Sequence, residues 1–259
     1  MLKKMRKKAG ALLVMICLGV IILLCWEAGE HLKDKILRSL ETAAEARTGK
    51  QTVVLDSGHG GSDSGKVGIN GAKEKEINLL IAKEIRRLLE KEKIEVIMVR
   101  EKDEELGKSK VEDLKYRVSL MNEKKPSLAV SIHQNSYHEE NVFGAQVFYY
   151  KTSTEGEKAA AVIQEALQEV NPENTKKIKA NDTYYLLKKT EVPTVIVECG
   201  FLSNPNEAKQ IATNEYQDKL IAGIVDAIQA YVQAKKESNG LPKVKTRSFL
   251  SRCLFKKSQ

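Results

Sequence analysis

Short apolar runs and longer segments with helical periodicity alternate through the middle of this 259-residue chain. Short apolar runs predict buried strands, and apolar residues recurring every three or four positions predict amphipathic helices. In chain order the pattern predicts strand 52–56, helix 74–91, strand 95–100, helix 111–122, strand 128–133, strand 144–150, helix 155–170, strands 183–187 and 194–198, and helices 204–213 and 216–235. Helices between strands act as crossover connections, so the pattern predicts an α/β fold: a single domain with a mostly parallel, twisted sheet of about six strands flanked by helices.

The first part of the chain has the pattern of a membrane anchor. Residues 9–26 are almost wholly apolar and follow five basic residues within positions 1–8. A run of about eighteen apolar residues is long enough to cross a bilayer as a helix. A cleaved signal peptide is the alternative, but no clear small-x-small cleavage site follows the run. We expect residues 1–26 to form a basic flank and transmembrane anchor, or an uncleaved signal, with everything after Glu27 outside the cytoplasm.

Two more segments lie outside the predicted domain. In residues 27–50, apolar residues recur at helical spacing among many charges, which predicts a juxtamembrane helical stalk. Residues 236–259 are basic, and Gly240 and Pro242 mark a break after the last predicted helix. We expect a disordered tail there, with contact to an anionic membrane or another protein surface as the alternative.

The basic character of the chain comes from its two ends. The formal net charge is +8, yet residues 1–8 carry five basic residues and residues 235–259 carry eight against one acidic residue. These ends hold more positive charge than the whole chain, so the part between them is net negative. Binding to nucleic acid needs basic residues on the folded domain. We therefore expect no nucleic-acid partner.

The four cysteines form no recognisable motif. Two lie in the predicted anchor, Cys199 ends a predicted strand, Cys253 lies in the tail, and no CxxC spacing occurs. The sequence therefore supports neither a thiolate zinc site nor a disulfide framework. Any bound metal must be held by nitrogen and oxygen ligands.

A glycine-rich turn with one histidine, DSGHGGSDSG at residues 56–65, directly follows the first predicted strand. Glycines let the backbone approach a bound group closely, and ligands bind at the carboxyl ends of parallel strands. The turn lacks both the GxxxxGK[ST] and GxGxxG spacings, so it does not predict nucleotide binding. A flexible loop with an incidental histidine is the alternative that the turn alone leaves open.

Three predicted strands end in reactive side chains: His59, His133 and Glu198. We expect them to meet at one sheet edge. Glu74 opens the helix after the histidine turn and would return to the same edge, although Glu76 fits this place equally well from spacing alone. Two imidazoles and a carboxylate form the ligand set of a catalytic zinc site with an open fourth position.

The remaining acid, Glu198, suits the role of general base. Zinc lowers the pKa of a bound water molecule from ~15.7 to about 7. A carboxylate outside the ligand set can accept the proton and return it to a leaving amine. The residues therefore predict hydrolysis of an amide.

Four stretches resemble the zinc-dependent N-acetylmuramoyl-L-alanine amidases of the amidase 3 type, over about residues 52–232. They are LDSGHGGSD (55–63), EKEINL (74–79), SIHQN (131–135) and VECGFLSNP (197–205). Members of this family are cell-wall hydrolases that cut the amide between the muramic acid lactyl group and the L-alanine of the stem peptide.

The resemblance implies that residues 51–235 form a zinc amidase catalytic domain. It implies one Zn²⁺ ion held by His59, Glu74 and His133, with Glu198 as the catalytic acid/base, and so selects Glu74 over Glu76. Ser57 stands where the family usually has proline. We expect this departure to loosen the turn without removing a ligand.

The stretches VREKD (99–103) and VEDLKYRV (111–118), the anchor and the lack of a separate wall-binding domain make the chain similar to germination-specific amidases of endospore formers. This implies a role in spore cortex maturation, through muramic-δ-lactam formation, and in germination. The implied partners are peptidoglycan and, through the anchor, the membrane. The implied location of the catalytic domain is the cell wall or the spore intermembrane space. The need for an accessory protein is open. The alternatives are an inactive, membrane-anchored peptidoglycan-binding or regulatory protein, and a zinc peptidase acting within the stem peptide.

Overall fold

The computed structural model describes residues 26, 29, 32–33, 35 and 51–238. The described residues before position 36 are helical. The predicted anchor, most of the predicted stalk and the tail after residue 238 lie outside the described residues, so these assignments stay predictions. No helix within the described ranges is long and apolar enough to cross a bilayer.

Strands and helices alternate through residues 51–238, as the hydrophobic pattern predicts. The elements are β1 (Thr52–Ser57), α2 (Glu74–Lys91), β2 (Glu95–Met98), α3 (Lys110–Lys124), β3 (Leu128–Asn135), β4 (Gln146–Tyr150), α4 (Thr154–Val170), β5 (Lys179–Asn181), α5 (Tyr185–Lys189), β6 (Thr194–Phe201), α6 (Pro205–Ile211) and α7 (Asn214–Ser238). Side chains cap three of the helices: Ser109 begins α3, Ser153 begins α4 and Asn204 begins α6, each accepting hydrogen bonds from backbone N–H groups of the first turn.

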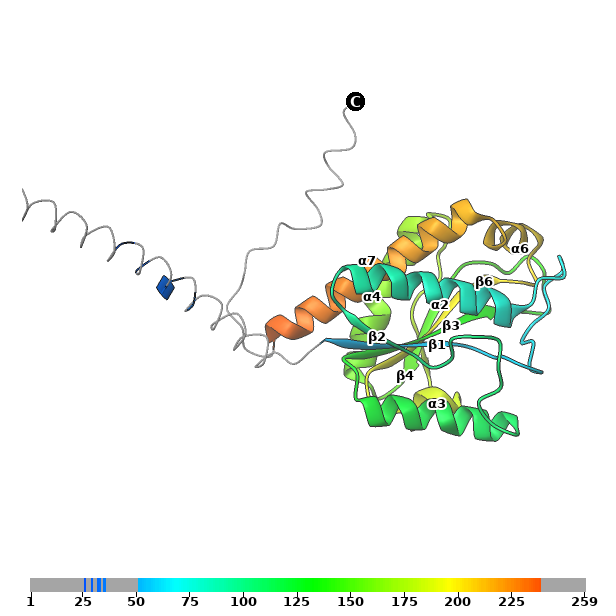
Figure 1. The fold of residues 1–259 in the computed structure, drawn as a ribbon. Helices are drawn as coiled ribbons and strands as arrows, with labels where there is room; N and C mark the ends of the chain where they lie inside the picture. Colours follow the sequence, from blue (N-terminus) through cyan, green and yellow to red (C-terminus); the bar gives the residue numbers. More distant parts are fainter. Residues whose placement is uncertain (1–25, 27–28, 30–31, 34, 36–50, 239–259) are drawn as a thin grey trace, which may run out of the picture. The chain divides into compact units, whose positions relative to one another are not determined.

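The strands form one six-stranded sheet in the order β2-β1-β3-β6-β4-β5. Every neighbouring pair is parallel except β4 and β6, which are antiparallel. Helices α2, α4 and α7 cover one face of the sheet and α3 covers the other (Figure 1). The predicted fold, a mostly parallel six-stranded sheet flanked by helices, is thus confirmed.

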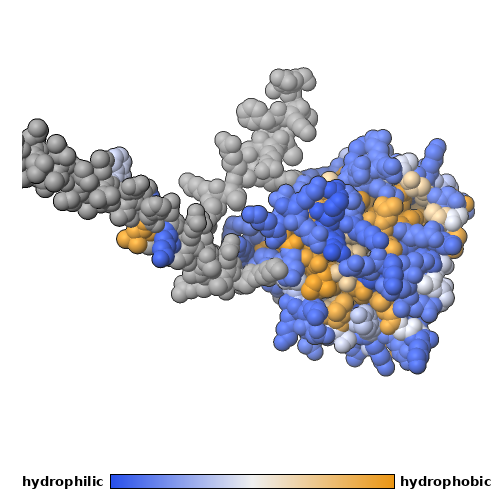
Figure 2. Space-filling view, in the orientation of Figure 1, coloured by the Kyte–Doolittle hydropathy of each residue, from blue (hydrophilic) through white to orange (hydrophobic). Residues whose placement is uncertain are grey.

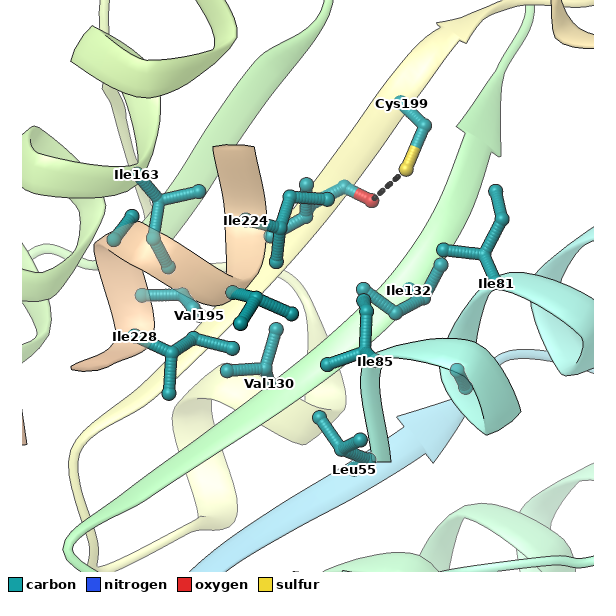
Figure 3. Close-up of a cluster of buried hydrophobic side chains, with 14 of the residues drawn as sticks. Leu55, Ile81, Ile85, Val130, Ile132, Ile163, Val195, Cys199, Ile224 and Ile228 are labelled. Atoms are coloured by element: carbon teal, nitrogen blue, oxygen red, sulfur yellow. Dashed lines mark hydrogen bonds between the residues drawn. The ribbon is translucent and has the colours of Figure 1, made fainter. Parts of the chain in front are cut away.

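The main hydrophobic core lies between the sheet and helices α2, α4 and α7. Figure 3 shows its strand residues facing its helix residues, which are Ile81, Ile85, Ile163, Ile224 and Ile228. A smaller cluster packs under α3 and α5 on the opposite face, around Met121 and Leu187. Because the central strands are buried on both faces, they read as continuous apolar runs in the sequence.

The surface shown in Figure 2 is mostly hydrophilic, and hydrophobic residues come to the surface near β2, between α2 and α3. β2 is an edge strand of the sheet, so this is where the two core layers approach solvent.

The predicted strand over residues 183–187 is wrong. This segment enters helix α5, and the nearby strand is β5, which is only three residues long and lies at the edge of the sheet. A short apolar run does not distinguish a buried strand from a short helix. The side chain of Asn181 accepts hydrogen bonds from the backbone N–H groups of Thr183 and Tyr184, which turns the chain before α5 begins.

Candidate metal centre and active site

Three candidate ligands meet near the carboxyl ends of β1 and β3: His59, Glu74 and His133. One ligand atom from each side chain lies within 4.8 Å of the others. Glu74 Oε2 lies 3.2 Å from His59 Nε2, and Glu74 Oε1 lies 2.9 Å from His133 Nδ1. Glu76, which sequence spacing allowed in the same place, is 59% exposed and faces Lys73. The structure therefore brings together the three residues that the sequence singled out.

These three side chains are electrostatically complementary. Burial alone would raise the pKa of Glu74, but hydrogen bonds and charge interactions with His133 and His59 outweigh it and hold this pKa well below its usual range. Burial opposes charging of His59 as well, yet Glu74 and Asp63 together raise its pKa. Glu74 is therefore ionised at neutral pH and gives the cluster a negative charge.

The donor set fits zinc. Two imidazole nitrogens and one carboxylate are common ligands of a catalytic zinc ion. Asp63 Oδ2 lies 2.9 Å from His59 Nδ1, which leaves Nε2 facing the cluster, and a carboxylate partner of this kind fixes the tautomer and direction of a metal-binding histidine. Backbone N–H groups of Gln134 and Lys66 hydrogen-bond the two oxygens of Glu74 and hold that carboxylate in place.

Glycine is required at the closest approaches in this centre. A Cβ atom on Gly58 would lie 2.1 Å from Cε1 of His133, and one on Gly65 would lie 2.6 Å from Oε2 of Glu74. His59 itself has a φ of 64°, in the left-handed region that residues other than glycine rarely occupy. The turn is therefore shaped to bring backbone and ligands together, as the sequence predicted from its glycines.

The turn is held at Ser57 through its backbone, and the expectation that serine here loosens the turn relative to proline stays a prediction. Ser57 is the last residue of β1 and is fully buried. Its carbonyl oxygen accepts hydrogen bonds from Nε of Arg100 and Nη1 of Arg117. Two buried guanidinium groups thus fix the backbone that a proline would otherwise stiffen.

Glu198 lies on β6 in register with His133 of β3. Burial, with a contribution from the charge of Glu74, raises the pKa of Glu198 to about 7, although His133 and His59 oppose this shift. Its Oε2 atom is buried and has no hydrogen-bond partner among the described residues. A carboxyl group that gains and loses a proton near neutral pH suits general acid/base chemistry.

His133 and Glu198 lie inside their strands rather than after them. The sequence placed the strand ends at these two residues, but β3 continues to Asn135 and β6 to Phe201. The register shifts after the His133–Glu198 pair, where β6 carries one more residue than β3. This bulge ends the regular pairing next to the cluster, a common position for such irregularities.

A groove of about 690 Å³ opens above this cluster. Its lining includes His59, His133 and Glu198, residues 107–110 before and at the start of α3, and residues 184–186 before and at the start of α5. Sequence reasoning missed Tyr184 and Tyr185 as groove residues because it assigned their segment to a strand.

Residues 53–230 match the family model described as N-acetylmuramoyl-L-alanine amidase. The chain belongs to this amidase family. The match spans β1 to α7 and includes the histidine turn, both strands of the cluster and Glu198.

Characterised amidases resemble the chain over most of its length. The germination-specific N-acetylmuramoyl-L-alanine amidase of Bacillus subtilis (strain 168) is 38% identical over 191 residues, which cover 71% of this chain and 80% of that protein. The CwlD amidase from Clostridioides difficile, solved in complex with the GerS lipoprotein, has a TM-score of 0.68 and 36% identity, covering 71% of this chain and 99% of that one.

The catalytic domain of CwlV, an N-acetylmuramoyl-L-alanine amidase from Bacillus (Paenibacillus) polymyxa var. colistinus, matches with a TM-score of 0.65 and 30% identity, covering 71% of this chain and 98% of that chain. The predicted enzyme class is thus confirmed: the protein is an N-acetylmuramoyl-L-alanine amidase.

Proposed function

We propose that this amidase uses one zinc ion, held by His59, Glu74 and His133, to hydrolyse the bond between N-acetylmuramic acid and L-alanine in peptidoglycan, with Glu198 as the general acid/base. One observation carries the proposal. Ligand atoms of the three side chains lie within 4.8 Å of one another, and His59 and His133 line the same groove as Glu198. The buried Oε2 atom of Glu198 has no hydrogen-bond partner among the described residues, and the pKa of this carboxyl group is raised to about 7.

The residues of the chain divide the work by their surroundings. Zinc, when bound, acts as a Lewis acid that polarises the scissile carbonyl and activates water for attack. Glu74 stays ionised and favours a cation in the site, while Asp63 directs Nε2 of His59 toward it. Glu198 accepts the proton of the attacking water on its carboxylate and then donates it to the nitrogen of the departing L-alanine.

Two substitutions separate metal binding from catalysis. Glu198→Gln should retain zinc and lose turnover, because an amide cannot accept the proton, whereas His59→Ala should lose both zinc and activity. Glu76→Gln is the matched control, because Glu76 is exposed and faces Lys73, and it should behave like the parent in both measurements. Turnover by Glu198→Gln at the parent rate would remove Glu198 from the mechanism, and undiminished zinc in His59→Ala by elemental analysis would remove His59 from the site.

Mass spectrometry of digested muropeptides identifies the bond that is cut. Release of stem peptides that begin with L-alanine supports the proposal. Stems shortened from within would identify a zinc peptidase instead, and an intact muropeptide pool would identify an inactive peptidoglycan-binding or regulatory protein.

We further propose a role in spore cortex maturation and germination, supported by the 38% identity to the germination-specific amidase of Bacillus subtilis. In this proposal residues 1–26 anchor the protein, residues 27–50 form a stalk, residues 51–235 form an extracytoplasmic catalytic domain and residues 236–259 form a basic tail. An accessory protein fits the same proposal, because the Clostridioides difficile relative was solved with a lipoprotein. Spores of a strain that lacks the gene should contain no muramic-δ-lactam, and a normal cortex in such spores would contradict the cortex role. The full chain should fractionate with membranes, and a full chain in the soluble fraction would contradict the anchor.

A further inference from the structure

Two buried arginines hold the backbone of the histidine turn through three consecutive carbonyl groups. Arg100, just after β2, donates from Nε to the carbonyl of Ser57 (2.9 Å) and from Nη2 to that of Gly58 (3.2 Å). Arg117, on α3, donates from Nη1 to the carbonyl of Ser57 (3.0 Å) and from Nη2 to that of His59 (2.9 Å). Arg100 and Arg117 are only 1% and 3% exposed.

Burying guanidinium groups is costly unless they are paired. Arg117 is paired with Asp56 and Asp113. Arg100 donates only to backbone carbonyls, those of residues 57, 58, 75 and 102, and none of its hydrogen-bond acceptors in the described part of the chain is a carboxylate. Arg100 thus gives its hydrogen bonds to the backbone, and Arg117 divides its own between two carboxylates and two backbone carbonyls. This use of buried donors points to a requirement for a defined turn conformation.

The residue that most needs such support is His59. Its φ of 64° lies in the left-handed region, which is unfavourable for a residue with a Cβ atom and persists only where the surroundings impose it. The hydrogen bond from Arg117 falls on the carbonyl of this residue. On the other side of the turn, Lys75 donates to the carbonyl of Gly61 and to Asp103, which in turn accepts the N–H of Gly61.

We infer that Arg117 is a positioning residue of the metal centre: it holds His59 in the left-handed conformation that directs Nε2 toward Glu74, and so sets the affinity for zinc. The inference rests on the proposed function, because it requires that His59 binds zinc. Arg117 acts through the backbone and makes no hydrogen bond to any of the three ligand side chains.

The test is Arg117→Lys in the full chain. Lysine keeps a positive charge beside Asp56, but a single ammonium group cannot reproduce the planar fork that reaches two carbonyls and two carboxylates. We expect zinc affinity, measured by competition with a chromophoric chelator, to fall about 10- to 100-fold, as for partners that orient metal ligands. The rise in melting temperature on adding zinc should shrink in parallel, and part of the lost kcat should return at high zinc concentration.

Two further variants make the result specific. Ile163→Val removes a methylene group from α4, in the main core, and should lower the melting temperature in chelator without changing zinc affinity. Arg100→Lys leaves the hydrogen bond to the carbonyl of His59 intact and should weaken zinc binding less than Arg117→Lys. If Arg117→Lys does not fold, the triple variant Asp56→Asn, Asp113→Asn and Arg117→Gln, which removes Arg117 together with both of its carboxylate partners, serves in its place with the same expectation.

Parent zinc affinity in a folded Arg117→Lys protein, with only a lower melting temperature, would overturn the inference and reduce Arg117 to a structural role. His59→Ala separates this from failure of the proposed function. If His59→Ala loses zinc while Arg117→Lys retains it, only the inference fails. If the parent binds no zinc, or His59→Ala binds it as tightly as the parent, the proposed zinc site fails and the inference fails with it.

Discussion

The substitution Gly58→Ala tests whether the candidate metal centre depends on the close approach between the backbone of Gly58 and the imidazole ring of His133. A Cβ atom at position 58 would lie 2.1 Å from Cε1, 2.2 Å from Nε2 and 2.6 Å from Nδ1 of His133. Carbon atoms in contact are separated by ~3.5–4.0 Å, so the rigid ring would have to move by more than about 1 Å. The φ of Gly58 is not in the left-handed region, so the alanine backbone itself is not strained.

A displacement of this size is large for a metal site, where ligand distances vary by about ±0.2 Å. A misplacement of ~1 Å can cost about 100-fold in rate. We therefore expect Gly58→Ala to lower both zinc affinity and kcat/KM by about 100-fold or more, while the overpacking costs about 1–3 kcal/mol of folding stability. Zinc content is measured by elemental analysis after dialysis, kcat/KM by release of stem peptide from purified muropeptides, and stability by urea unfolding.

Gly71→Ala is the matched control. Gly71 has a φ of +78°, and a Cβ atom there would meet no atom within 4 Å. This variant should lose about 1–2 kcal/mol through backbone strain and keep the parent's zinc affinity. A Gly58→Ala protein with parent zinc content and turnover would refute the reasoning, because it would mean that the centre does not need the observed position of the His133 ring.

Three other predictions concern neighbouring groups. Because burial raises the pKa of Glu198 from 4.5 to about 7, the zinc-free folded protein retains a proton that the unfolded chain releases, and stability falls as the pH rises from 4.5 through 7. Glu198→Gln should abolish this loss. In chelator, its free energy of unfolding should exceed that of the parent by up to about 3 kcal/mol at pH 8 but not at pH 4. Parallel pH profiles of the two proteins in urea unfolding would contradict this prediction. Ser57→Ala should raise the free energy of unfolding by about 1 kcal/mol, because the Ser57 hydroxyl is buried without a hydrogen-bond partner in the described structure, whereas a decrease would reveal a partner. Asp63→Asn should weaken zinc binding about 10- to 100-fold in chelator competition, since Asp63 orients His59, and unchanged affinity would contradict that role.

The hydrophobic pattern was sufficient to predict most of the fold, because strands that are buried on both faces have continuous apolar sequences. It failed at β5 and α5 for the corresponding reason. β5 is an edge strand whose residues Lys179 and Ala180 are exposed, so it carries no apolar signal. The apolar residues that follow belong to a helix of five residues, which is too short to show a helical period.

The candidate ligands could be predicted because topology alone brings the ends of parallel strands to one edge. Glu74 was ambiguous with Glu76, since spacing cannot tell which side of a helix start faces the sheet. Arg100 and Arg117 could not be found this way, because buried and exposed arginines look alike in a sequence. Their role depends on which carbonyl groups their guanidinium groups reach, and only the three-dimensional arrangement contains that information.

The register between His133 and Glu198 has a consequence for control of the enzyme. The two residues are partners on β3 and β6, adjacent central strands whose backbones lie about 4.8 Å apart and are joined by a ladder of hydrogen bonds. The backbones of the proposed base and the proposed ligand therefore cannot move apart unless the middle of the sheet separates, which would amount to unfolding. The sheet keeps these two positions adjacent whenever the protein is folded. We therefore expect its activity in a cell to be limited by occupancy of the proposed metal site, by the location of the protein, or by access of substrate to the groove.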